Sequence, residues 1–158
     1  MLGPLATRFP VAPGNASALS SNGLIFQLLH GVEAPFGLKL VETIDVREAA
    51  HAHVLALRSP SSSEVGRKRI LLRGGAFSWQ DAAAHLRSAR PTIAARLPLF
   101  KDSHDAPPLA AEWDMRHSKE ILGIGELKPW QSFVEDAVDA ILALEEEWKE
   151  KESKASQA

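Results

Sequence analysis

Hydrophobic and polar residues recur along the chain with spacings that predict a mostly helical protein. The clearest pattern covers residues 130–148, where apolar side chains return every three or four positions. The apolar positions are Trp130, Phe133, Val134, Ala137, Val138, Ile141, Leu142 and Trp148. Pro129 suits the first turn of such a helix. The pattern therefore predicts a long amphipathic helix that packs its apolar stripe against the rest of the protein.

A nearly all-apolar stretch, residues 24–29, predicts a short and largely covered helix near the beginning of the chain. Ser20 or Ser21 is expected to cap it, and Gly31 to end it.

Two further helices are predicted from their capping residues. Asp45 followed by Glu48 is close to a capping box and opens a helix. Its apolar positions share one face and are Val46, Ala49, Ala50, Val54 and Leu57. Ser78 and Asp81 open the other helix, which Pro91 ends.

Residues 38–44 and 69–73 are rich in β-branched or aliphatic residues, and each predicts a short strand. Two short strands do not easily form a stable sheet, so they need a larger structure to pack on. Residues 91–113 are rich in proline and predict an irregular segment. Residues 117–125 predict a short helix that stops at Gly123 or Gly125, because this glycine pair lacks the third glycine of a dinucleotide loop.

The composition is that of an ordinary single globular domain. The chain has 158 residues, a net charge of −2, a pI near 6.3 and no cysteine. No basic surface points to a nucleic-acid partner. No apolar run approaches the roughly 18 residues of a membrane helix. A cytoplasmic location agrees with the absence of cysteine.

Two histidines and an arginine in residues 42–57 are the first candidates for chemistry. On a helix, His51 and His53 project about 200° apart, so they cannot hold one metal ion together. We therefore expect no metal site, and we expect His53 to be a hydrogen-bonded core residue. Arg47 has two interpretations: it forms a salt bridge beside the capping residue Asp45, or it lines a pocket.

Taken in order, several motifs resemble the C-terminal half of an extended short-chain dehydrogenase/reductase. They are Gly3-Pro4, "SSN" at 20–22, "TIDVREAAHAHVLAL" at 43–57, "RILLRGG" at 69–75, "FSWQD" at 77–81, "RLP" at 96–98, "KEILG" at 119–123 and "PW" at 129–130. The closest subgroup is the fungal NAD(P)-dependent epimerase/dehydratase-like reductases, which are related to dihydroflavonol, cinnamoyl-CoA and aldehyde reductases. Glu48 departs from the family, which has an aspartate there.

The resemblance implies an α/β fold: the substrate-binding, C-terminal portion of a Rossmann-type fold, mostly helical with two or three short strands. It implies one partial domain over residues 1–152 and a disordered tail over 153–158. The implied activity is hydride transfer between NADP or NAD and the carbonyl or alcohol group of a small molecule. By the same resemblance, Pro4 and Ser21 bind the cofactor, near its nicotinamide and its phosphates. Asn22 and Arg47 contact the substrate.

The family's proton-transfer group is a Tyr-x-x-x-Lys motif, and this chain contains no tyrosine. No glycine-rich turn follows a strand in the sequence either. We therefore assign no catalytic residue, and we expect the chain alone to be inactive and to bind the cofactor weakly.

Two interpretations stay open. In the first, the chain is a fragment, and Met1 is an internal residue of a longer reductase. In the second, it is a non-catalytic binding or regulatory half-domain that pairs with a full-length reductase or with itself. Both expect residues 24–29 and 38–44 to expose an apolar patch unless a partner covers it.

Overall fold

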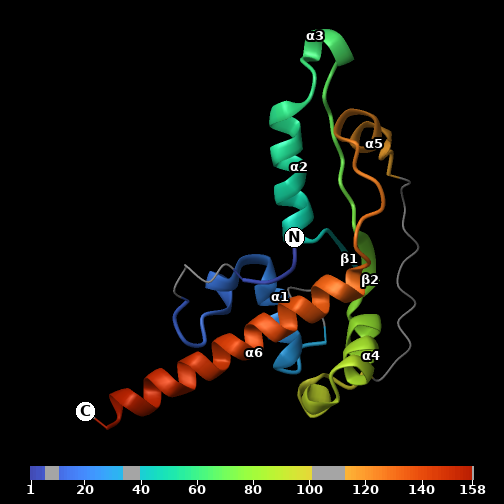
Figure 1. Ribbon diagram of the computed structural model, residues 1–158. Coiled ribbons are helices and arrows are strands. Elements are labelled where there is room, and N and C mark those ends of the chain that lie inside the picture. Colours follow the sequence, from blue (N-terminus) through green and yellow to red (C-terminus); the bar gives the residue numbers. More distant parts are fainter. Residues whose placement is uncertain (6–10, 34–39, 101–112, 158) are drawn as a thin grey trace.

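The computed structural model describes residues 1–5, 11–33, 40–100 and 113–157 (Figure 1). The helices are η1 (Ala16–Asn22), α1 (Gly23–Leu29), α2 (Val46–Arg58), α3 (Ser62–Val65), α4 (Trp79–Ala89), η3 (Pro91–Arg96), α5 (Arg116–Leu122) and α6 (Trp130–Ala155). The strands are β1 (Leu40–Thr43) and β2 (Gly75–Ser78). Helix α6 includes the first residues of the stretch that was expected to be a tail.

Helix α6 forms the centre of the core, as its apolar stripe predicts. Phe133, Val134 and Ile141 are completely buried, and α6 contacts α1, α4 and β2. Its C-terminal part projects away from these elements (Figure 1). Trp148 anchors this part, because its indole Nε1 donates a hydrogen bond of 2.8 Å to the Val11 carbonyl.

The apolar patch expected from residues 24–29 and 38–44 does not exist among the described residues of these segments. Ile25 and Leu28 are 0% exposed, Leu29 is 1% exposed, and Val41 is 6% exposed. Helix α6 packs against α1, and all four residues belong to one core cluster with the buried face of α6. The expectation was wrong because it gave α6 no role in covering these faces.

Strands β1 and β2 pair antiparallel, with Val41 opposite Phe77 and Thr43 opposite Gly75. Leu2 forms a parallel β-bridge with Asp45, between β1 and α2. Its N–H donates to the Ile44 carbonyl at 3.1 Å, and its carbonyl accepts from the Val46 N–H at 2.9 Å. The expected fold, mostly helical with two or three short strands, is confirmed.

The predicted strand over 69–73 is wrong, since these residues are extended but unpaired in the described structure. Pairing begins at Gly74, whose N–H donates to Thr43 at 2.9 Å. A Cβ on Gly74 would lie 3.2 Å from the Ile44 Cα, so glycine permits this close approach.

The helix-capping predictions have mixed outcomes. Ser78 and Asp81 form the complete predicted capping box of α4. Asp45 caps α2 by accepting from the Arg47 N–H at 2.7 Å, but Glu48 instead accepts from the Lys128 N–H at 2.8 Å. The predicted cap at Ser20 or Ser21 is wrong, because both residues lie inside η1, and α1 starts only at Gly23.

Helix α2 rises away from the core beside α5 (Figure 1) and buries only its alanine face, Ala49 and Ala52. Val54 is 47% exposed and Leu57 is 88% exposed. His53 is also exposed, so its prediction as a core histidine is wrong. Its Nδ1 lies 2.7 Å from the Ala49 carbonyl of its own helix.

Candidate functional site

The N-terminal segment Leu2–Pro4 brings together three of the four residues that the sequence analysis assigned to a site. The Asn22 side-chain Nδ2 donates a 2.8 Å hydrogen bond to the carbonyl of Gly3, the residue before Pro4. Asn22 is only 8% exposed, whereas Pro4 and Ser21 are half-buried. The structure thus brings Asn22 to the Gly3-Pro4 segment, and Ser21 is its neighbour in the chain.

Gly3 allows this turn to pass close to α2. Its φ of +143° is unfavourable for residues with a side chain. A Cβ on Gly3 would also stand 2.9 Å from the Val46 Cγ1 and 3.5 Å from the Asp45 Oδ1. The Gly3 backbone therefore lies against the first turn of α2, with no space there for a side chain.

One of the two polar groups of the Asn22 side-chain amide forms no hydrogen bond within the described residues. Its Nδ2 donates to the Gly3 carbonyl, but its Oδ1 is buried and has no partner among the described residues. A buried acceptor without a donor costs roughly 1–3 kcal/mol. Ser20, two residues earlier, adopts the strained angles φ 52° and ψ −133°. An unsatisfied acceptor beside strained backbone is typical of sites that receive a bound group.

Asp45 lies next to the same segment, at the start of α2. Its carboxylate is 0% exposed and accepts from the Arg47 Nε at 2.9 and 3.1 Å, with the Lys128 Nζ at 3.7 Å. Burial favours a raised pKa for Asp45. Hydrogen bonds from Arg47 and the positive charges of Arg47 and Lys128 outweigh burial, so the pKa is lowered.

The Arg47 side chain is engaged by two carboxylates, Asp45 and Asp136 of α6. The salt-bridge interpretation of Arg47 is confirmed, and its contact with a substrate stays a prediction. From the sequence, Asp45 was expected only as a helix cap. The buried link from the N-terminal turn to α2, α6 and Lys128 was missed, because no local spacing relates these segments.

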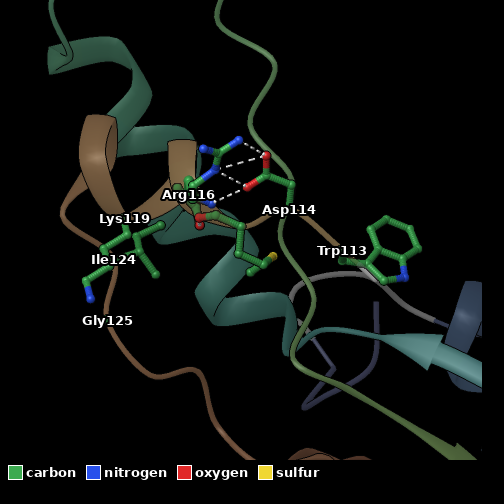
Figure 2. Close-up of a pocket in the computed structure, with 8 residues that line it drawn as sticks. Trp113, Asp114, Arg116, Lys119, Ile124 and Gly125 are labelled. Carbon is green, nitrogen blue, oxygen red and sulfur yellow. Dashed lines mark hydrogen bonds and ion pairs between the residues drawn. The ribbon is translucent and has the colours of Figure 1, made fainter. Parts of the chain in front are cut away.

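A pocket of about 600 Å³ lies elsewhere, around α5 (Figure 2). Its walls are Trp113, Asp114, Met115, Arg116, Ser118, Lys119, Ile124 and Gly125. Asp114 holds the Arg116 guanidinium at 2.7–3.2 Å, and Trp113 stands apart from this pair (Figure 2). None of the four predicted site residues lines this pocket.

No cluster of metal-ligating side chains occurs among the described residues. No helix in the described ranges is long and apolar enough to cross a membrane.

Solved structures with a similar fold include reductases. Yeast methylglyoxal/isovaleraldehyde reductase Gre2, complexed with NADPH, matches with a TM-score of 0.62 and 25% identity, over 91% of this chain and 44% of that protein. Gre2 from Candida albicans with NADPH matches with a TM-score of 0.67 and 22% identity, over 90% and 41%. A reductase engineered to attenuate substrate inhibition matches with a TM-score of 0.63 and 28% identity, over 89% and 41%.

The chain has the fold of one part of these reductases. It spans about two fifths of their length, which is consistent with a C-terminal half. The predicted resemblance and fold class are therefore confirmed. Both Gre2 structures named above are complexes with NADPH. No family model matches the sequence, and no curated protein does.

Proposed function

We propose that residues 1–152 are the substrate-side portion of an NAD(P)-dependent carbonyl reductase of the extended short-chain dehydrogenase/reductase, epimerase/dehydratase-like group. The likeness to reductases over about nine tenths of the chain supports this proposal. The observation that carries it is the Gly3-Pro4 segment, where the Gly3 carbonyl accepts a hydrogen bond from Asn22 and Gly3 lies against Asp45 and Val46 at the start of α2. Location in the cytoplasm and a small carbonyl-containing substrate belong to the same proposal.

The residues present fit one edge of a nicotinamide cofactor and not the whole molecule. Gly3 keeps side-chain atoms away from the turn, and the Asn22 Oδ1 is a free acceptor next to it. In the proposal, Pro4 faces the nicotinamide, Ser21 faces the phosphates, and Asn22 and Arg47 contribute to the substrate wall. The sequence has neither a tyrosine nor a glycine-rich strand-to-helix turn, so we derive no catalytic step from this chain.

The proposed role of the chain is therefore positioning, and by itself it should not reduce a carbonyl group. A separate nucleotide-binding lobe would supply the glycine-rich cofactor loop and the proton donor. When bound, NADPH supplies the hydride for such a reduction.

A test is to measure NADPH oxidation with isovaleraldehyde, the substrate in the name of yeast Gre2. The purified chain is assayed alone and after mixing with the separately produced nucleotide-binding half of Gre2. We expect no turnover from the chain alone and measurable turnover from the mixture. Asn22→Ala should lower turnover of the mixture, whereas Gln157→Ala, which removes an exposed amide beyond the end of α6, should not. Turnover by the chain alone would overturn the proposal.

The second candidate is a non-catalytic half-domain that pairs with a full-length reductase or with itself. The burial of α1 and β1 residues under α6 favours it, because a chain with its own core can persist without a second lobe. In this case the chain would change the activity of intact Gre2 and would give no turnover with the isolated half.

A further inference from the structure

A second, smaller cavity lies where β1 ends, beside the segment that leads into β2. Its volume is about 150 Å³, and its walls are Met1, Glu42, Thr43, Ile44, Leu72, Arg73 and Trp113. It shares no residue with the four assigned to the proposed site. This volume is below the roughly 300–1,000 Å³ of pockets for drug-sized ligands, so only a small group fits.

Two side chains of this cavity carry hydrogen-bond donors without acceptors. Thr43 is 8% exposed, and its Oγ1 is buried without a partner in the described part of the chain. Arg73 is half-buried, and its Nε is likewise buried and unpartnered. Within the described part of the chain, Arg73 takes part in no ion pair. Leaving a charged donor unpaired costs more than leaving a neutral one unpaired.

The other residues that line the cavity limit which ligands could accept hydrogen bonds from Thr43 and Arg73. Ile44, Leu72 and Trp113 offer apolar surface, which suits a short hydrocarbon group. Glu42 lies on the exposed face of β1, because alternate residues of a strand point to opposite sides. Because Glu42 also lines the cavity, its negative charge opposes any anion there and disfavours a multiply charged one such as phosphate most. Two donor side chains match the two oxygens of one carboxylate.

We propose that this cavity binds a small monocarboxylate, an acid with a short apolar chain. The carboxylate would accept from the Arg73 guanidinium and the Thr43 hydroxyl, and its chain would lie against Ile44, Leu72 and Trp113. The proposal is independent of the proposed reductase function, because it uses other residues and needs no nicotinamide.

The test is calorimetric titration of the full 158-residue chain with butyrate, with butyramide and phosphate as comparison ligands. Butyrate should bind more tightly than either. Arg73→Gln should weaken butyrate binding by about tenfold or more, since it removes a charge-assisted hydrogen bond. The matched control is Arg69→Gln, which makes the same charge change at an exposed arginine outside the cavity and should leave affinity unchanged.

Thr43→Val gives a second readout that does not depend on Arg73. This variant should weaken butyrate binding and also raise the melting temperature of the free protein, because it removes a buried, unpartnered hydroxyl. Circular dichroism verifies that each variant folds, and Arg73→Lys replaces Arg73→Gln if the latter does not.

Three outcomes would overturn the proposal. The first is no butyrate binding to the unmodified chain at millimolar concentration. The second is an equal loss of binding in Arg69→Gln, which would mean attraction by net charge only. The third is phosphate binding as tightly as butyrate.

Discussion

At the scale of single residues, the fold depends on a few polar and glycine positions around the N-terminal turn. Asp45 is the most constrained, since its carboxylate has no solvent exposure and its charge is balanced by Arg47 and Lys128. Removing one partner of a buried ion pair leaves the other charge uncompensated. Asp45 should therefore matter more for stability than any exposed ion pair of α6.

Asp45→Asn should lower the free energy of unfolding at pH 7 by about 3 kcal/mol. The folded-state pKa of Asp45 is lowered from its ordinary value of 3.8, so its stabilising effect is present above that value. This effect is lost as the pH falls through the lower, folded-state pKa. Urea titrations from pH 7 to pH 3 should show the difference between the two proteins shrinking below about pH 4. A difference that does not change with pH would show that Asp45 acts through its shape and not its charge.

Gly3→Ala should destabilise the protein by roughly 1–3 kcal/mol, because the new Cβ would meet the Val46 Cγ1 at 2.9 Å. Gly31→Ala is the matched control. Gly31 also has a positive φ of 82°, but a Cβ added there would have no atom of the described residues within 4 Å, so only backbone strain of about 1 kcal/mol is expected. Thermal unfolding of both variants gives the comparison, and equal losses would show that the contact with α2 is unimportant.

At the scale of elements, the sequence predicted correctly those features that depend only on residues close together in the chain. The capping box at Ser78 and Asp81 and the stripe of α6 were found because each lies within a few residues or repeats regularly. The start of α1 and the position of β2 were misplaced. The strand at 75–78 is set by its pairing with β1, and glycines at 74 and 75 weaken its sequence signal.

The apolar residues of α2 and α6 have similar helical spacing but opposite environments. Ile141 on α6 is 0% exposed, whereas Leu57 on α2 is 88% exposed. Ile141→Ala should cost about 2–5 kcal/mol through the cavity it leaves, and Leu57→Ala should change stability by less than about 0.5 kcal/mol. Chemical denaturation measures both. A large loss in Leu57→Ala would mean that this face of α2 is covered in solution.

At the scale of the whole molecule, α6 explains why a chain with two fifths of a reductase's length can have a core. It buries its stripe against α1, α4 and β2, and so it covers surfaces that were expected to need a second lobe. The candidate site is different: Asn22, Gly3 and Asp45 meet through contacts between distant segments. Their residue types were visible in the sequence, but their contacts became visible only in the structure.

We propose that this chain folds on its own core and carries only one edge of a nicotinamide site. The most direct test is thermal unfolding, followed by circular dichroism at about 222 nm, with and without roughly 1 mM NADPH. A ligand present well above its dissociation constant raises the unfolding midpoint of a protein that binds it. We predict one cooperative transition whose midpoint NADPH leaves unchanged. A broad, non-cooperative transition would contradict the independent core, and a midpoint raised by NADPH would contradict the incomplete cofactor site.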